Sequence, residues 1–144
     1  MFRILFVDDE PENVEFVCNT VRDALGADVV LATTVEEATD ALAGEPFDLV
    51  IADIFLPMGA RPGGPLGPRA VHYEEHLEHL GGAVLLDELA RLDPTPRILV
   101  HTACIDPEII DLVDDQVYAR VPKPAPVDAL LRHVIEALDL PVPG

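Results

Sequence analysis

Five polar side chains of this chain each follow or end a short apolar run, and together they could bind a phosphoryl group. They are three carboxylates, one hydroxyl and one ammonium: Asp8, Asp9, Asp53, Thr102 and Lys123. Carboxylates that lie close together repel one another unless a cation joins them, and ligands that are all oxygen favour a hard ion such as Mg²⁺. A magnesium ion, a lysine and a threonine hydroxyl could then bind phosphoryl oxygens. Taken singly, Asp53 is also compatible with a solvated turn and Lys123 with an ordinary surface lysine.

The elements that must bring these residues together are five apolar runs, which we interpret as buried parallel strands. The expected strands cover residues 4–7, 28–33, 49–52, 97–102 and 116–121. A helical pattern follows each of them, with the expected helices beginning at Pro11, Val35, Ala83, Pro107 and Val127. This alternation predicts one parallel sheet with helices on both faces, a doubly wound α/β fold of five βα units. Because the C-terminal ends of such strands converge, we expect the five polar side chains to share one crevice.

One segment, residues 58–81, interrupts this alternation after the third strand. Residues 58–70 are rich in glycine and proline and predict no regular structure, whereas residues 71–80 predict a short helix. The pair Gly81 and Gly82 is expected to break that helix. The segment begins beside Asp53, and loops of this length are usually functional or disordered.

Three histidines lie on one face of the expected helix in this insertion: His72, His76 and His79. The simplest interpretation is a small amphipathic helix that packs by its neighbouring tyrosine and leucine stripe and leaves the histidines in solvent. The alternatives are a lid over Asp53, a dimer or partner surface, or a metal or pH sensor.

The totals favour one acidic domain, at residues 1–140, followed by a short tail at residues 141–144. The chain has 144 residues and a net charge of −18, from 27 acids against 9 lysines and arginines. Such a surface repels phosphate backbones and anionic lipids, so we expect no nucleic-acid or membrane partner. No apolar stretch approaches the ~20 residues of a spanning helix, and no signal peptide opens the chain. Cys18 and Cys104 show no metal-ligand spacing, and we expect a cytoplasmic protein.

The motifs resemble those of a CheY-like response-regulator receiver domain of bacterial two-component signalling. The resemblance rests on the pair Asp8 and Asp9 after the first strand, on Asp53 followed four residues later by Pro57, on Thr102 followed by alanine, and on Lys123 followed by proline. It covers nearly the whole chain apart from the insertion. The fold it implies is the flavodoxin-like (βα)5 sandwich.

The resemblance also implies a role for each site residue. Asp53 is expected to accept a phosphoryl group from a sensor histidine kinase or a phosphotransfer protein, with Thr102 and Lys123 contacting the phosphoryl oxygens. The carboxylates of Asp9 and Asp53 and the backbone carbonyl of Phe55 are expected to bind Mg²⁺ directly. Asp8 is expected to hold a metal-bound water. Such a domain is not an enzyme, and it signals by contacting a downstream protein or by forming a homodimer.

Three features depart from the family pattern. Arg120 stands where the family usually has its switch aromatic, so the usual switching arrangement is in doubt. Pro122 removes a backbone donor at the end of the fifth strand. Phe55 and Cys104 occupy positions that tune the phosphoryl lifetime in this family, and since neither activates water well, we expect a long-lived phosphoryl state.

Two other functions stay open from the sequence. One is an interaction module that keeps the pocket but signals through its insertion without phosphorylation. The other is a phosphatase that uses Asp53 as a nucleophile, as haloacid-dehalogenase-like enzymes do. Those enzymes place a second acid two residues after the nucleophile, and that residue is Phe55 in this chain.

Overall fold

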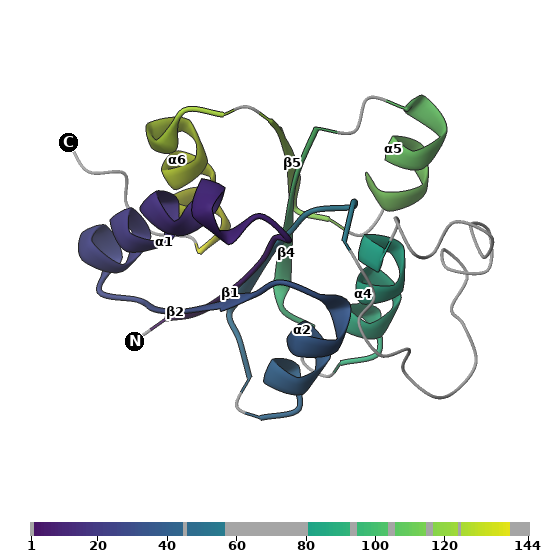
Figure 1. The fold of residues 1–144 in the computed structure, drawn as a ribbon, viewed down its shortest axis with the longest axis horizontal. Helices are drawn as coiled ribbons and strands as arrows, with labels where there is room; N and C mark the ends of the chain where they lie inside the picture. Colours follow the sequence, from purple (N-terminus) through teal and green to yellow (C-terminus); the bar gives the residue numbers. More distant parts are fainter. Residues whose placement is uncertain are drawn as a thin grey trace.

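Five parallel strands form one sheet in the described part of the chain, as the computed structural model in Figure 1 shows. The structure describes residues 2–44, 46–56, 81–92, 95–103, 106–114, 117–123 and 125–138. The strands are β1 (Arg3–Val7), β2 (Asp28–Ala32), β3 (Leu49–Ala52), β4 (Arg97–Thr102) and β5 (Ala119–Pro122). Their order in the sheet is β2-β1-β3-β4-β5. This is the strand order of flavodoxin-like doubly wound folds, so the predicted fold class is confirmed.

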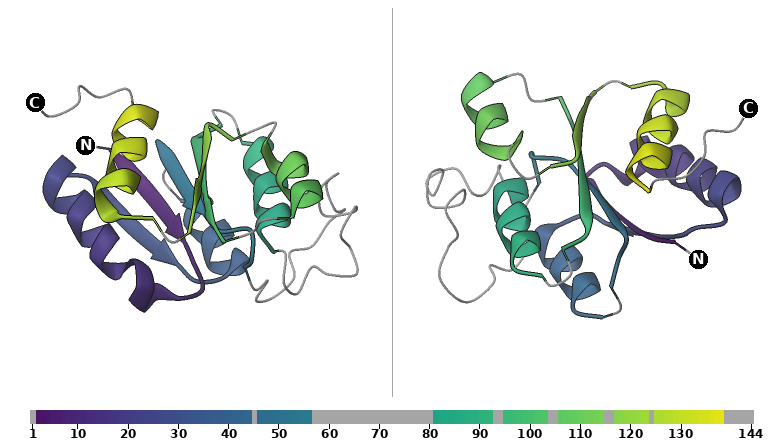
Figure 2. Two further views of the ribbon diagram at one scale, coloured as in Figure 1. Left: turned by 90° about the horizontal axis from the view of Figure 1, so that it is seen from above. Right: turned by 180° about the vertical axis from the view of Figure 1, so that it is seen from behind.

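Helices cover both faces of this sheet. They are α1 (Pro11–Leu25), α2 (Val35–Leu42), α4 (Gly81–Ala90), α5 (Pro107–Asp114) and α6 (Val127–Ala137). Figures 1 and 2 show α1 and α6 on one face of the sheet and α2, α4 and α5 on the other. Among the described residues, no helix combines the length and the apolar character that crossing a membrane requires.

Local signals in the sequence set the ends of three helices. Pro11 opens α1, and Gly26 ends it in the left-handed conformation, with a φ of 61°. Glycine adopts this conformation without steric cost, which makes it the usual residue at a helix end. The Thr34 hydroxyl caps α2 by accepting a hydrogen bond from the backbone N–H of Glu37 at 3.1 Å. The Asp106 carboxylate caps α5 in the same way.

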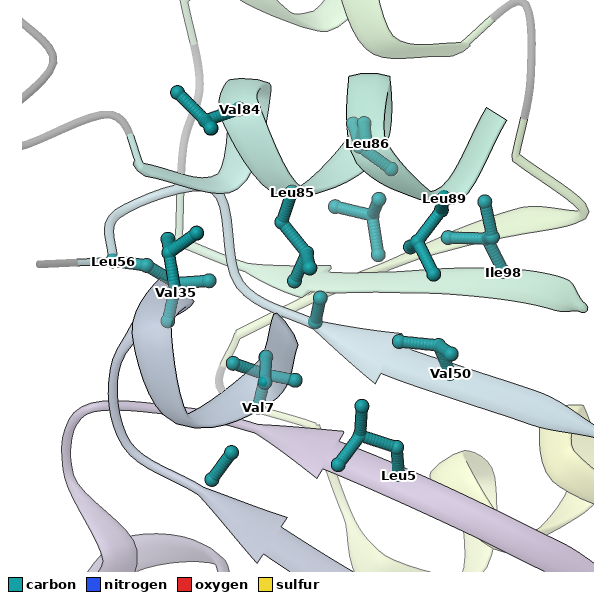
Figure 3. Packing of buried hydrophobic residues seen from close by; sticks show 14 of the residues in the cluster. Leu5, Val7, Val35, Val50, Leu56, Val84, Leu85, Leu86, Leu89 and Ile98 are labelled. Atoms are coloured by element: carbon teal, nitrogen blue, oxygen red, sulfur yellow. The ribbon is translucent and has the colours of Figure 1, made fainter. Parts of the chain in front are cut away.

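Two apolar clusters, one on each face of the sheet, hold the layers together. Figure 3 shows the cluster under α2 and α4, where Leu85 and Leu89 of α4 meet Val50 of β3 and Leu5 of β1. On the other face, α1 and α6 pack on alternate strand residues such as Phe6 and Leu99. Because the central strands are covered on both faces, the four residues of β3 are all fully buried.

Three expectations about secondary structure need comment. The pair Gly81 and Gly82 forms the first turn of α4, which begins two residues earlier than predicted; the helix that this pair was expected to end lies outside the described residues. Strand β5 begins at Ala119 and not at residue 116, since its pairing with β4 starts only at the partners Leu99 and Ala119. The predicted helix at residues 71–80, with its three histidines, lies outside the described residues.

Candidate phosphoacceptor site

The register of the sheet brings Asp8 and Asp53 side by side. Val7 of β1 pairs with Ala52 of β3, and each of these residues immediately precedes one of the two aspartates. The backbone N–H of Asp53 donates to the Val7 carbonyl at 3.1 Å, which extends this pairing by one step. The two carboxylates therefore leave neighbouring strands at the same edge, as the sequence predicted.

Strands β4 and β5 bring a lysine to this edge through their own register. Thr102 ends β4 and pairs with Pro122 of β5, and the backbone N–H of Lys123 donates to the Thr102 carbonyl at 2.9 Å. Thr102 is itself buried. The sheet thus places Lys123 at the edge that carries the two aspartates.

The Lys123 ammonium bridges the two carboxylates. Its Nζ lies 2.7 Å from an oxygen of Asp8 and 2.9 Å from an oxygen of Asp53. Asp8 is 1% exposed and Asp53 is 7% exposed, so both charges are largely removed from water. Burial alone would lower the pKa of Lys123, but the hydrogen bonds from its ammonium to Asp53 and Asp8 outweigh burial and raise that pKa. Lys123 therefore stays positively charged at neutral pH.

The second oxygen of each buried aspartate is held by the backbone. The N–H of Glu10 donates to Oδ1 of Asp8 at 2.9 Å, and the N–H of Phe55 donates to Oδ1 of Asp53 at 3.1 Å. In both cases the donor lies two residues after the aspartate, which is the geometry of an Asx turn. These turns fix the direction in which each carboxylate points, and they satisfy an oxygen that burial would otherwise leave costly.

Asp9 completes a group of three carboxylates that could hold a cation. One oxygen from each of Asp8, Asp9 and Asp53 lies within 4.8 Å of the other two. Asp9 is exposed, yet its pKa is raised, first by partial burial and then by the negative charges of Asp8 and Asp53. Lys123 alone does not balance three carboxylates. The all-oxygen donor set therefore fits Mg²⁺, which accepts a few carboxylates and keeps several waters.

The remaining predicted site residues are placed only in part. Phe55 follows Asp53 by two residues and its side chain is 40% exposed, while the metal-binding role of its carbonyl stays a prediction. Contact of the Thr102 hydroxyl with a phosphoryl group also stays a prediction. Cys104 lies outside the described residues.

The residues near the expected switch position take a different arrangement from the family pattern. Arg120 is partly buried on β5 and pairs with Val100, which belongs to the cluster beneath α2 and α4. Tyr118 is exposed, and its hydroxyl donates to the carbonyl of Glu136 in α6 at 3.3 Å. The guanidinium of Arg97 lies 5.3 Å from the Tyr118 ring. Tyr118 is thus tied to the far end of α6.

Two residues close to the site were not predicted from the sequence to be part of it. His101 is 7% exposed on β4, its ring lies edge-on to Phe6, and neither ring nitrogen has a hydrogen-bond partner. Its pKa is lowered, first by burial and then by the charge of Lys123. Gly82 touches the backbone just after Asp53. No sequence pattern links either residue to the site, because the proximity of both to the site depends on contacts between distant segments.

Comparison with known proteins finds similarity to response-regulator receivers. No family model matches the chain. A response regulator receiver protein from Anaeromyxobacter sp. strain Fw109-5 is 27% identical over 132 residues, covering 91% of this chain and 46% of that protein. The chain spans less than half the length of the curated relatives it matches.

Solved structures agree on the fold. A CheY-like receiver domain from Methanospirillum hungatei JF-1 has a TM-score of 0.74 and 24% identity, with 96% of this chain and 94% of that one covered. The non-phosphorylated HemR receiver domain from Leptospira biflexa has a TM-score of 0.67 and 22% identity, with 100% and 99% covered.

The strand order and the acidic strand-end site define a doubly wound α/β protein of the flavodoxin-like class. Within that class, the chain has the fold of a CheY-like response-regulator receiver domain. The resemblance found in the sequence is therefore confirmed.

Proposed function

We propose that this chain is a phosphoacceptor receiver domain whose Asp53 is phosphorylated by a sensor histidine kinase or a phosphotransfer protein. The observation that carries the proposal is the Lys123 ammonium held between Asp8 and Asp53, beside a third carboxylate. An isolated structural ion pair needs one acid, whereas this edge of the sheet gathers three. Convergent charged groups of this kind at strand ends are typical of a reactive site.

In the proposed reaction, a carboxylate oxygen of Asp53 attacks the phosphorus of a phosphohistidine. The new O–P bond forms as the P–N bond breaks, and the imidazole leaves with the bonding electron pair and takes up a proton. Lys123 is placed to stabilise the negative charge of the transferred phosphoryl group. Asp9, Asp53 and the Phe55 carbonyl would hold Mg²⁺ directly and Asp8 would hold it through a water; the ion would offset the negative charge of the phosphoryl oxygens.

The output of the switch is proposed to be protein contact. A net charge of −18 disfavours nucleic acid and favours protein partners with basic surfaces. We propose a downstream protein target, homodimerisation as a second output, and action in the cytoplasm. No catalytic turnover is proposed, because receiver domains are signalling modules.

Intact-mass measurement after incubation with acetyl phosphate and Mg²⁺ tests the proposal directly. We expect one phosphoryl adduct on the wild type, none on Asp53→Asn, and none when a chelator removes the metal. Asp40→Asn is the matched control, since Asp40 is an exposed aspartate of α2. It should form the adduct like the wild type.

Two outcomes separate the alternatives, one in this experiment and one in a turnover assay. Absence of an adduct under every condition would favour the interaction module that signals without phosphorylation. Steady turnover of a generic phosphate ester would favour the phosphatase. If the adduct forms, its decay after removal of acetyl phosphate tests the expected long lifetime, and rapid loss from the isolated protein would contradict that expectation.

A further inference from the structure

The carbonyl of Ile54, the residue directly after the phosphoacceptor, joins two parts of the chain. It accepts hydrogen bonds from the backbone N–H of Leu56 and from that of Gly82, each at 3.0 Å. The side chain of Ile54 is 1% exposed and belongs to the apolar cluster beneath α2 and α4. The first turn of α4 is therefore attached to the loop that carries Asp53.

At this attachment there is no room for any side chain on Gly82. A Cβ added there would lie 2.5 Å from the Cα of Ile54 and 2.6 Å from the carbonyl oxygen of Asp53. Contacts under 3.0 Å essentially never occur, and both neighbours are backbone atoms that cannot rotate away. Moving from 2.5 Å to 3.0 Å requires a displacement of about 0.5 Å in the loop, in α4 or in both.

That displacement matters because the Asp53 carboxylate is positioned by the same loop. One oxygen accepts from the Phe55 N–H at 3.1 Å, and the other lies 2.9 Å from Nζ of Lys123. Reactive groups must be held within about 0.5 Å of their productive geometry. To the extent that the displacement falls on the backbone of Asp53 and Ile54, it moves the carboxylate relative to Lys123 by an amount comparable to this limit.

We propose that Gly82 is a positioning residue for the phosphoacceptor: its missing side chain allows α4 to press against the Asp53 loop and to fix the carboxylate beside Lys123. This inference deepens the proposed phosphorylation of Asp53 and rests on it. The atoms nearest to a Cβ at Gly82 are backbone atoms of Asp53 and Ile54, so Gly82 is inferred to act through this backbone.

The test compares Gly82→Ala with two controls in acetyl phosphate reactions at saturating Mg²⁺. Gly44→Ala is the matched glycine control, because a Cβ at Gly44 meets only the Ala41 carbonyl at an ordinary 3.5 Å. Val134→Ala is the stability control, since Val134 is a fully buried residue of α6 on the opposite face of the sheet. The measured quantities are the maximal phosphorylation rate and the midpoint of thermal unfolding.

We expect the maximal rate of Gly82→Ala to fall by about tenfold or more, as misplacement by a fraction of an ångström predicts. The two controls should keep the wild-type rate within about twofold, even where Val134→Ala lowers the unfolding midpoint, because a protein that is still folded reacts normally. A Gly82→Ala rate equal to that of the controls overturns the inference. If the wild type itself forms no adduct, the proposed function fails instead.

A measurement on the wild type covers the case in which Gly82→Ala does not fold. Titration with Mg²⁺ alone is followed through the backbone amide resonances of the whole chain. We expect the Gly82 signal to shift with the same midpoint as the signals of Asp8 and Asp9, because its N–H is bonded to the Ile54 carbonyl. The Gly44 signal should stay fixed. An unchanged Gly82 signal during saturation of the acidic residues overturns the inference.

Discussion

Removing the charge of Asp9 should stabilise the metal-free protein. Asp9 lies within 4.8 Å of both Asp8 and Asp53, measured between one carboxylate oxygen of each, and its pKa is raised by partial burial and by these two charges. A raised pKa means that the ionised carboxylate is less favourable in the folded chain than in the unfolded chain. The variant Asp9→Asn keeps the shape of the side chain and removes the repulsion.

The size of the effect follows from the distances. Two like charges 4.8 Å apart repel by about 0.9 kcal/mol at the dielectric constant of water, which is the appropriate value for the exposed Asp9. Asp9 has two such neighbours, and the attraction of Lys123 offsets part of the sum. We therefore expect Asp9→Asn to raise the free energy of unfolding by about 1 kcal/mol at pH 7 in a chelator.

Magnesium should reverse the order of stability. At a Mg²⁺ concentration ten times the wild-type dissociation constant, the wild type gains about 1.4 kcal/mol, because the ion binds the folded chain only. Asp9→Asn lacks one charged ligand and should gain much less. The variant is thus expected to be more stable than the wild type without Mg²⁺ and less stable with it.

Urea unfolding followed by circular dichroism measures both differences. The exposed control Asp40→Asn should stay within about 0.5 kcal/mol of the wild type in either buffer. The stabilisation of Asp9→Asn in chelator should shrink as the pH falls through the pKa of Asp9, because protonation removes the same repulsion in the wild type. The reasoning is refuted if Asp9→Asn is less stable in chelator, or if Mg²⁺ stabilises both proteins equally.

Three further predictions follow from the same contacts. Lys123 is the only lysine, so a protein labelled with ¹³C-lysine gives one side-chain signal. Titration of this signal should show that the pKa of Lys123 lies above that of free lysine in the wild type and that this pKa is lower in Asp53→Asn. The contribution of Lys123 to the free energy of unfolding should be lost as the pH rises through that pKa. Replacing residues 57–80 by a short glycine–serine linker should preserve the unfolding midpoint and the phosphorylation of Asp53, because N–H groups on both sides of the segment donate to the Ile54 carbonyl; loss of the folded state would contradict this. Thr34→Ala should lower the free energy of unfolding by about 1 kcal/mol through loss of the α2 cap without changing the phosphorylation rate, and an altered rate would contradict a purely local role.

The sequence was enough to predict that the site lies at the carboxyl edge of the sheet. Each apolar run ends close to a polar residue, and in a parallel sheet these ends converge. The ion pairs of Lys123 were not predictable in detail, because they depend on the register that pairs Val7 with Ala52 and Thr102 with Pro122. Strands buried on both faces are nearly uniform in apolar character, so their sequences carry little information about register.

The first residues of α4 and of β5 both differ from the prediction. Two consecutive glycines disfavour a helix by local propensity, but α4 needs Gly82 to approach the Ile54 backbone. The apolar pattern around Val117 is typical of a strand, yet the paired residues of β5 start at Ala119, opposite Leu99 of β4. At α4, a contact between distant segments overrides a correct local signal.

The charge of the site explains why the fold must hold its carboxylates so firmly. Three aspartates and one lysine leave two negative charges at the edge of the sheet. Repulsion of this size would turn flexible side chains away from one another. Backbone N–H groups hold one oxygen of Asp8 and one of Asp53, Lys123 holds the other oxygen of each, and the α4 attachment fixes the loop behind Asp53. Unfavourable charge held in place in this way supports the proposal that the acidic edge binds a cation and a phosphoryl donor.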